Sequence, residues 1–313
     1  MHVMTTPADA ARDALDGLAL GDAFGELWFP WFRPGDSAIE GIRARRTPQE
    51  PTWRWTDDTA MAVSVLRVLR EHGTVRQDRL AEAFGAAYVA DAHRGYGNGM
   101  RRLLPELAKR PESWRTEARN LFNGQGSLGN GAAMRVAPLG AWFHEDLDEV
   151  MDQAVLSAEV THAHPEAIAG AVAVAVAAAL AARGRDRPAP EASTFLREVA
   201  ALTPAGQVAA GLRRAAGLPA GTAPAEAADV LGNGRLIRAS DTVPFALWSA
   251  ARHLDSLLDA LWTTAEGLGD IDTNCAISGG TVAARTGTAG VPETWWARRE
   301  PLPGGLATAR TGT

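Results

Sequence analysis

Two short acidic clusters near opposite ends of a 313-residue chain most constrain how it can fold. The first is Thr56-Asp57-Asp58-Thr59 and the second is Asp270-Ile271-Asp272-Thr273. A single Asp or Thr at a helix start is ordinarily a cap, because it accepts a backbone N–H that the first turn leaves unpaired. One cap needs only one acceptor, so two such doublets predict a further role. If the clusters meet, the chain closes on itself, which favours one domain over residues 1–313.

The residue types in these clusters favour hard cations. Carboxylate and hydroxyl oxygens are ligands that suit Mg²⁺, Mn²⁺ or Ca²⁺ better than zinc. Converging carboxylates without a cation would repel one another and raise their pKa values. We therefore expect the clusters to share two divalent cations, Mg²⁺ or Mn²⁺. Cys275 is the only cysteine, which excludes an internal disulfide and a cysteine-based zinc cluster and is typical of a reducing compartment.

Composition excludes several other classes of protein. Hydrophobic residues make up 46% of the chain and charged residues 22%, ordinary values for a soluble globular protein. The net charge of -6 argues against direct binding to a nucleic-acid backbone. Residues 1–20 lack the pattern of a signal peptide, and the Ala-rich run 167–182 is short for a membrane span and predicts a buried helix. We expect a cytoplasmic monomer that does not enter a membrane.

Hydrophobic periodicity predicts an all-α fold. Apolar residues recur at helical spacing in most segments, and no sustained period-two alternation with hairpin signals is found. The predicted helices include residues 8–24, 58–71, 80–92, 100–109, 146–160, 193–202, 204–216, 242–251, 254–267 and 274–285. Pro and Gly in residues 28–52 predict a long loop that forms a lid or pocket wall. The tail after Gly287 predicts coil that packs through Trp295 and Trp296.

A third feature is the run Gly124-Gln125-Gly126-Ser127-Leu128-Gly129-Asn130-Gly131. Alternating glycines before a helix expose backbone N–H groups, which suits a phosphate or diphosphate. The run matches neither the P-loop nor the Rossmann pattern, and by itself a flexible turn explains it equally well. His162 and His164 lie at a helix end, where caps or core residues are the commoner roles, so neither is expected in the metal shell.

In their order along the chain these motifs resemble the ADP-ribosylglycohydrolase family, which includes the dinitrogenase reductase-activating glycohydrolase and the ADP-ribosyl-acceptor hydrolases. The matching segments are residues 17–25, 55–59, 94–97, 126–135, 161–162 and 269–273. The resemblance implies a compact, single-domain orthogonal bundle of helices with a two-metal site. The ligands that it implies are Thr56, Asp57, Asp58, Asp270, Asp272 and Thr273.

The resemblance also implies an ADP-ribose site. Its loop, matched by Gly126, Ser127, Leu128, Gly129, Asn130 and Gly131, would hold the diphosphate and ribose. Phe122 matches an aromatic residue near the adenine, and His162 matches a histidine that reaches the phosphates. Leu128 replaces an aromatic residue found in some relatives. The implied substrate is an ADP-ribosylated protein or another ADP-ribosyl conjugate.

The implied reaction is hydrolysis of the bond between ADP-ribose and an acceptor, with protein arginine expected first. Cleavage at the anomeric carbon builds oxocarbenium character that carboxylates stabilise, and the expected catalytic residues are Asp57, Asp58 and Glu26. Relatives commonly carry a glutamate four residues after the glycine that matches Gly25, where this chain has Phe29.

That departure leaves alternatives open. Asp36 or Glu40 could replace the missing glutamate instead of Glu26. The protein could be a catalytically impaired ADP-ribose binder, or a hydrolase of serine, nucleobase or small-molecule conjugates. A dinuclear phosphohydrolase that acts on a nucleotide diphosphate is a further alternative.

Overall fold

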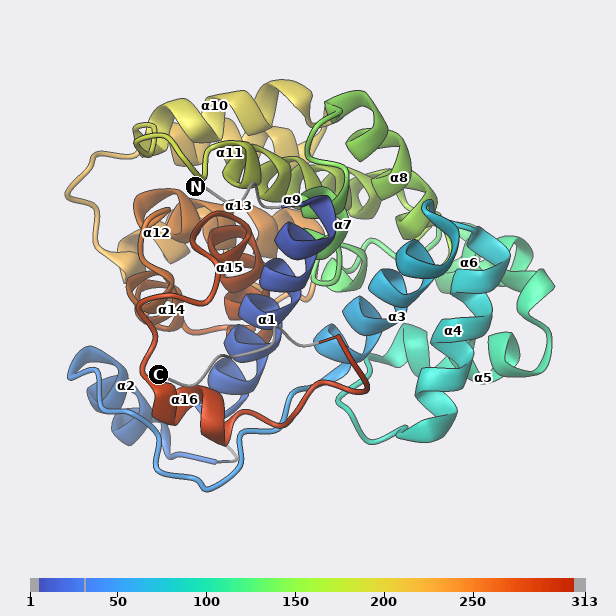
Figure 1. The fold of residues 1–313 in the computed structure, drawn as a ribbon, viewed down its shortest axis with the longest axis horizontal. Helices are drawn as coiled ribbons and strands as arrows, with labels where there is room; N and C mark the ends of the chain where they lie inside the picture. The colour runs from blue at the N-terminus through green and yellow to red at the C-terminus, as the bar shows by residue number, and fades with distance from the viewer. Residues whose placement is uncertain (1–5, 31, 307–313) are drawn as a thin grey trace.

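The computed structural model describes residues 6–30 and 32–306, and within these ranges every regular element is a helix (Figure 1). The all-α prediction is therefore confirmed. The α-helices are α1 (Pro7–Glu26), α2 (Gly35–Arg43), α3 (Asp57–His72), α4 (Gln77–Ala90), α5 (Asn98–Lys109), α6 (Trp114–Gly124), α7 (Ala137–Trp142), α8 (Leu147–Glu159), α9 (Pro165–Arg183), α10 (Ala192–Leu202), α11 (Gln207–Ala216), α12 (Pro224–Leu231), α13 (Ala239–Arg252), α14 (Leu257–Ala265), α15 (Ile271–Thr286) and α16 (Glu293–Arg298). Two 3-10 turns, η1 (Pro111–Ser113) and η2 (Asn130–Ala132), complete the set.

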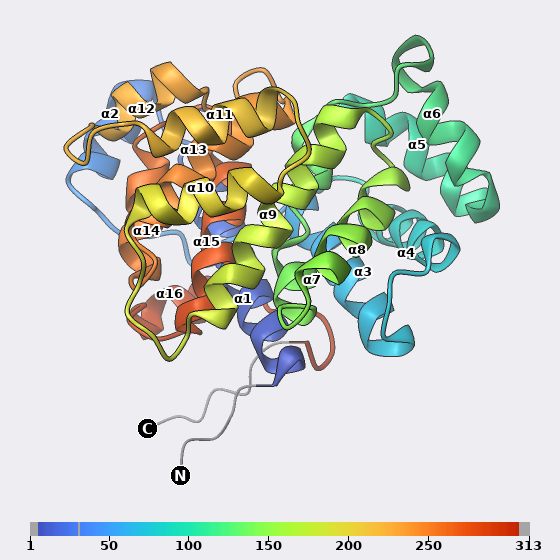
Figure 2. The ribbon, with the colours of Figure 1, turned by 90° about the horizontal axis from the view of Figure 1, so that it is seen from above.

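The first long helix packs mainly against the last long one. α1 and α15 lie side by side in Figures 1 and 2 and run antiparallel through the core. Small residues allow this close approach: a Cβ on Gly21 would overlap the carbonyl oxygen of Cys275, and one on Gly25 would lie 2.6 Å from Cα of Asp272. This contact brings the end of α1 against the start of α15, where the second acidic cluster lies.

Helix α9 crosses the centre of the bundle. It is long and apolar enough to cross a membrane, but 78% of its apolar window is buried inside the protein. Its alanines and valines pack against α7, α8, α13 and α15. The predicted buried helix is confirmed, because the same apolar surface that lipid could cover is already covered by other helices.

Several helices lie where the sequence predicted none. Residues 28–52 were expected to be a loop, yet they contain α2, which buries Ala38 and Ile42 one helical turn apart. The many Pro and Gly residues around this short segment hid its amphipathic pattern. α16 likewise interrupts the predicted coil of the tail, although Trp295 and Trp296 are buried as expected. α6 and α12 were also missed, and α12 begins with Pro224 at a position that favours proline.

An aromatic cluster joins the end of α1 to the tail. Phe24 stacks on Trp295 with ring centroids 4.8 Å apart, and Trp53 meets Trp295 edge-on at 5.1 Å. Trp262 packs edge-on against Phe24 at 4.9 Å. Such contacts each add about 0.5–1.5 kcal/mol beyond the area that they bury. They fix Trp53, and therefore the chain that leads into the first acidic cluster.

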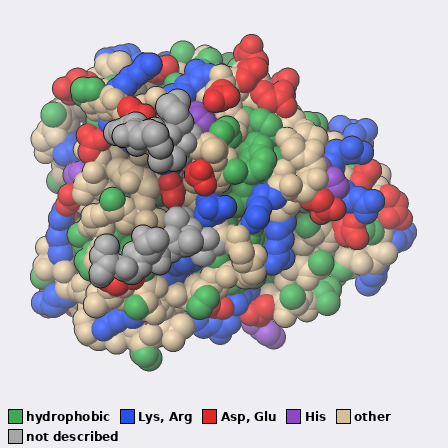
Figure 3. Space-filling model, viewed as in Figure 1, with side chains coloured by type: hydrophobic (Ala, Val, Ile, Leu, Met, Phe, Trp, Pro, Cys, Tyr) green, Lys and Arg blue, Asp and Glu red, His purple; other side chains and the backbone are tan. Residues whose placement is uncertain are grey.

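On the face shown in Figure 3, basic side chains are interspersed with acidic ones. Both signs of charge are therefore present on the part of this face that the structure describes.

Candidate active site

A cavity of about 700 Å³ brings the two acidic clusters and the glycine-rich run together. The predicted residues that line it are Asp57, Asp58, Phe122, Gly126, Ser127, Leu128, Gly129, Asn130, Gly131, His162, Asp270, Asp272 and Thr273. Thr56 and Glu26 are not among the lining residues. A second cavity of about 580 Å³, lined in part by Trp248 and Arg252, contains neither acidic cluster and none of the predicted site residues.

Neither acidic cluster acts as a simple cap of its own helix. Thr56 and Asp270 occupy the N-cap positions of α3 and α15, yet neither side chain makes a capping hydrogen bond. Instead, the hydroxyl of Thr56 lies 3.2 Å from Oδ2 of Asp58. Both clusters lie at helix N-termini, where the helix dipole favours negative charge. The capping interpretation therefore does not account for these residues.

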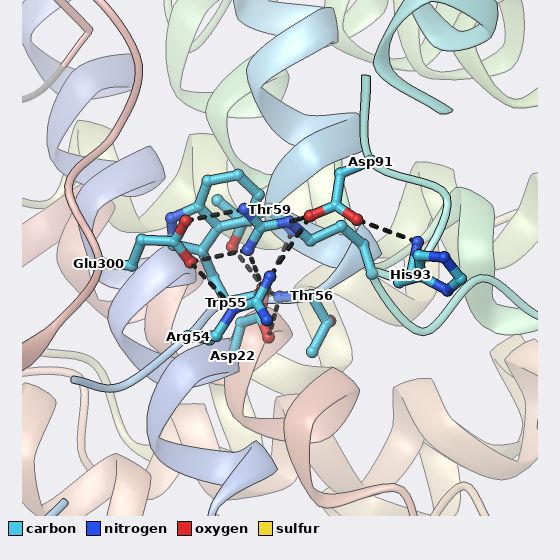
Figure 4. Close-up of polar contacts among 9 residues, drawn as sticks. Asp22, Arg54, Trp55, Thr56, Thr59, Asp91, His93 and Glu300 are labelled. Atoms are coloured by element: carbon cyan, nitrogen blue, oxygen red, sulfur yellow. Dashed lines mark hydrogen bonds and ion pairs between the residues drawn. The ribbon is translucent and has the colours of Figure 1, made fainter. Parts of the chain in front are cut away.

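The cap of α3 comes from another helix. Asp22, in the middle of the α1 motif, accepts the backbone N–H of Thr56 at 2.9 and 3.0 Å and that of Thr59 at 3.1 Å. The Thr59 hydroxyl donates to the same carboxylate at 2.5 Å (Figure 4). Asp22 is fully buried, and it was not identified as a site residue from the sequence. The surrounding motif, residues 17–25, was among the segments that match the family, but its contacts with Thr56 and Thr59 became visible only in the fold.

Burial and mutual repulsion raise the pKa values of the clustered carboxyls. Burial raises the pKa of Asp57 to about 8, and the charges of Asp22, Asp270 and Glu26 add to the effect. Burial, then Asp270 and Asp58, raise the pKa of Asp272 well above its usual range. Negative charge at this site is thus unfavourable unless protons or cations neutralise it.

The surroundings of Asp58 fit a divalent cation. Its pKa is raised well above the usual range, first by burial and then by neighbouring carboxylates, while a hydrogen bond with Thr273 opposes the rise. The Oδ1 atom of Asp58 is buried and has no hydrogen-bond partner. Among the described residues, no three acidic, His or Cys side chains already converge as a ready ligand group. Threonine hydroxyls and backbone oxygens would therefore have to complete the coordination, as hard cations accept.

Of the three acids considered as a replacement for the missing glutamate, Glu26 lies nearest to the cluster. Its charge raises the pKa values of both Asp57 and Asp272. Asp36 and Glu40 are exposed on α2 and do not line the cavity. Phe29, at the position of the family glutamate, packs against the aromatic cluster instead.

The glycine-rich run forms a loop that ends in η2. It follows a sharp turn in which Phe122 and Asn123 adopt φ values of 52° and 59°, and this turn leaves the Phe122 side chain 50% exposed at the cavity. Asn130 then links the loop to the second acidic cluster, because its Nδ2 donates to Oδ2 of Asp270 at 2.7 Å and to the Thr242 hydroxyl at 3.0 Å.

The segment between α12 and α13 forms another wall, which sequence analysis missed. Leu236 and Ile237 line the cavity although they are 61% and 53% exposed. Arg238 lies across from the loop, because it forms an isolated antiparallel bridge with Gly129. Exposed apolar side chains beside Phe122 suit a flat ring. The only sequence signal was an apolar pair that follows Asn233 and Gly234 in a turn.

His162 lines the cavity as a neutral imidazole. Burial, and then the charge of Arg135, lower the pKa of His162 to about 3, and its Nδ1 lies 2.7 Å from the Thr161 hydroxyl. Arg135 is fully buried and donates to the carbonyl oxygens of Gly131 at 3.2 Å and Ser157 at 2.8 Å. It therefore supports the loop from behind. His164 caps α9 by accepting the N–H of Glu166 at 3.1 Å.

Known proteins resemble this chain over most of its length. The sequence profile of a family described as ADP-ribosylglycohydrolase matches residues 4–310. ADP-ribosylhydrolase ARH3 of Gallus gallus is 33% identical over 182 residues, which cover 53% of this chain and 48% of the relative. ARH3 of Homo sapiens is 36% identical over 119 residues, 38% of this chain and 32% of the relative. ADP-ribosylarginine hydrolase Tri1 of Serratia proteamaculans is 29% identical over 174 residues, 51% and 44%.

The match thus spans about half of the first of these relatives, and less of the others. A solved structure named "ADP-ribosylglycohydrolase-related protein complex" covers 95% of this chain and 94% of its own, with a TM-score of 0.58 and 22% identity. That likeness shows that the two proteins share a fold.

Proposed function

Because this chain belongs to the ADP-ribosylglycohydrolase family, we propose that it is a hydrolase that releases ADP-ribose from a modified acceptor and depends on divalent cations. One observation carries the proposal: a single cavity joins the two acidic clusters to the glycine-rich loop and to Phe122. Its volume of about 700 Å³ lies within the range of pockets that bind small molecules and cofactors.

The roles of the residues follow from their positions along the cavity. In the loop of residues 126–131, the N–H groups of Gly126 and Gly129 donate to the Leu121 carbonyl oxygen and the Ser127 hydroxyl, and those of the other loop residues suit a diphosphate. Phe122 with Leu236 suits the adenine ring. Neutral His162 can donate or accept a hydrogen bond beside the phosphates. The distal ribose would then extend toward Asp57 and Asp272.

Thr56, Asp57, Asp58, Asp270, Asp272 and Thr273 are the residues that would hold two cations, Mg²⁺ or Mn²⁺. Bound cations supply Lewis-acid polarisation of the ribose hydroxyls and of an attacking water. The carboxylates orient the sugar and stabilise the positive charge that builds at the anomeric carbon as its bond to the acceptor breaks. Glu26 and Asp57 are the candidate residues to accept and return a proton.

We propose protein arginine as the acceptor. One of the relatives is named an ADP-ribosylarginine hydrolase, which agrees with this choice. Serine, nucleobase and small-molecule conjugates are the competing acceptors in the test.

One observation favours a second candidate, an ADP-ribose binder with little or no turnover. The position of the family glutamate carries Phe29, whose ring packs in the aromatic cluster. A phenyl ring can neither move a proton nor ligate a cation. The second candidate is therefore correct if Glu26 does not take over that role.

A panel of ADP-ribosylated substrates tests the proposal. Arginine-, serine-, nucleobase- and small-molecule-linked ADP-ribose are each incubated with Mg²⁺, with Mn²⁺ and with a chelator, and the products are identified by mass spectrometry. We expect intact ADP-ribose from the arginine conjugate only when a cation is present. AMP among the products would indicate a phosphohydrolase. Micromolar binding of ADP-ribose with no release from any conjugate would favour the second candidate.

A further inference from the structure

An ion pair outside the cavity holds the segment that carries the first acidic cluster. The guanidinium of Arg94 meets the carboxylate of Glu300 with two hydrogen bonds of 2.7 Å, although the two residues are 206 positions apart in the chain. Arg94 Nη1 also donates to the carbonyl oxygen of Trp55 at 2.8 Å, and its guanidinium lies 3.7 Å from the centroid of the Trp55 ring.

Arg94 also holds this segment through its own backbone. Its carbonyl oxygen accepts the N–H of Asp57, the first residue of α3, at 2.7 Å. One residue therefore contacts the chain on either side of Thr56, by side chain at Trp55 and by backbone at Asp57. Asp91 Oδ2 lies 3.0 Å from Nε of Arg94, so the guanidinium has a second carboxylate beside it.

The tail contributes a matching backbone contact. The N–H of Glu300 donates to the carbonyl oxygen of Trp53 at 2.8 Å, and the N–H of Trp53 donates to that of Arg298 at 2.7 Å. These two bonds form an isolated parallel bridge between Trp53 and Arg299. The residues that precede the acidic cluster are therefore held between the tail and Arg94.

We propose that Arg94 and Glu300 are positioning residues that set the geometry of Asp57 and Asp58 for cation binding. This inference rests on the proposed function, because it concerns the cation site of that reaction. Neither side chain lines the cavity or touches the reacting atoms. Arg94 contacts the backbone of Trp55 and Asp57 directly, and Glu300 acts through the Arg94 guanidinium and the backbone of Trp53.

The geometry of the pair gives it more influence than an ordinary surface salt bridge. The side chain of Arg94 is only 11% exposed and that of Glu300 24% exposed, so water screens the pair weakly. A bidentate contact between an arginine and a carboxylate fixes the orientation of the guanidinium as well as its distance. Stacking of the guanidinium on the Trp55 ring restricts that orientation further. A lysine at position 94 would keep the charge and lose both features.

Two variants test the proposal. Glu300→Gln removes the negative charge that pairs with Arg94. Arg94→Lys removes the bidentate contact with Glu300 and the stacking on Trp55. Calorimetry with Mg²⁺ and with Mn²⁺ measures the affinity for cations, and thermal unfolding measures stability. Titration with ADP-ribose in the presence of a chelator measures the affinity of the glycine-rich loop and Phe122 for the ligand without cations. We expect both variants to lose about tenfold or more in cation affinity, the usual cost of altering groups that orient metal ligands. ADP-ribose affinity in chelator stays unchanged.

Asp13→Asn provides a matched control. Asp13 pairs with Arg185 at 2.8 Å, and both side chains are 15% exposed, so this ion pair resembles the first in burial. It lies 13 residues before Glu26 on α1, which corresponds to about 20 Å along the helix. We expect Asp13→Asn to lower thermal stability and leave cation affinity at the wild-type value.

The possible results separate this inference from the proposed function. Wild-type cation affinity in Glu300→Gln, or a loss in Asp13→Asn that matches it, overturns the positioning role while the proposed function stands. A wild-type protein that binds neither cation overturns both. Loss of cation affinity confined to Glu300→Gln and Arg94→Lys supports the inference.

Discussion

The carboxylate of Asp22 accepts the backbone N–H of Thr56 at 2.9 and 3.0 Å, so the N-terminus of α3 is capped by a residue of α1. Capping by a distant residue ties the two helices together at the point where the first acidic cluster begins. Because α1 also packs against α15, the same helix positions both clusters.

Replacing Asp22 with alanine should therefore affect stability and cation binding together. The change leaves buried N–H groups of α3 without a partner, and we expect the free energy of unfolding to fall by about 1–3 kcal/mol. Chemical denaturation measures this loss, and calorimetry with Mg²⁺ should reveal weaker binding. Asp146→Ala is the control, since Asp146 caps α8 through the N–H groups of Asp148 and Glu149. An equal loss of Mg²⁺ affinity in that variant would contradict the prediction.

Asp272→Asn should separate stability from activity. The substitution removes one charge from a crowded cluster, while its amide oxygen can still accept the N–H of Thr273, which lies 2.7 Å from Oδ1 of Asp272. We expect the cation-free protein to melt at a higher temperature at pH 8, and release of ADP-ribose to fall by more than about 100-fold because a cation ligand is lost. A variant that melts earlier than the wild type without cation would show that repulsion among the carboxylates does not limit the stability of the cation-free protein.

Cation-dependent stabilisation should grow with pH. Folding raises the pKa of Asp57 from its usual 3.8 to about 8, mainly through burial. Between these values the folded chain retains a proton that the unfolded chain releases, so the free energy of unfolding of cation-free protein falls as pH rises. Mg²⁺ binds only the folded, ionised site and should offset that fall.

The measurement is a thermal melt with Mg²⁺ and with a chelator at pH 5 and pH 8. We expect a larger difference in melting temperature between Mg²⁺ and chelator at pH 8, because protons occupy the carboxylates at pH 5. Equal differences in melting temperature at the two pH values would mean that Mg²⁺ does not bind to the carboxyls whose pKa is raised.

Phe122→Ala should weaken ADP-ribose binding without altering cation binding. The ring is half exposed at the cavity, so its removal costs little packing. Loss of stacking on a base is worth about 1–3 kcal/mol, or roughly 5- to 150-fold in affinity. Titration with ADP-ribose measures the loss, Phe122→Tyr should restore binding, and Val89→Ala, at another exposed apolar residue, should have no effect. An unchanged affinity of Phe122→Ala for ADP-ribose would show that the adenine does not stack on Phe122.

Much of the site could be predicted from sequence because its residues lie in contiguous motifs. Asp57 and Asp272 each lie in the first turn of a helix, in a pattern that capping alone did not explain, and the structure brings them to one cavity. The all-α fold followed from apolar periodicity in the same way. The cation ligation and the catalytic roles stay predictions.

The missed residues share a different property. Asp22, Arg94 and Glu300 act through partners that are distant in sequence, and a single chain gives no sign of which distant residues will meet. Helix α2 was missed for a local reason, since the two apolar side chains that it buries, Ala38 and Ile42, could not outweigh the surrounding Pro and Gly. Leu236 and Ile237 were missed because exposed apolar residues in a turn carry no periodic signal.

The contact between Glu300 and Arg94 joins the tail to the first third of the chain. During translation, α1 and α3 leave the ribosome long before α15 and the tail are synthesised. The carboxylates of α1 and α3 are therefore synthesised before the second acidic cluster and before Glu300. A chain truncated before Asp270 would lack both the second acidic cluster and the contact of Glu300 with Arg94.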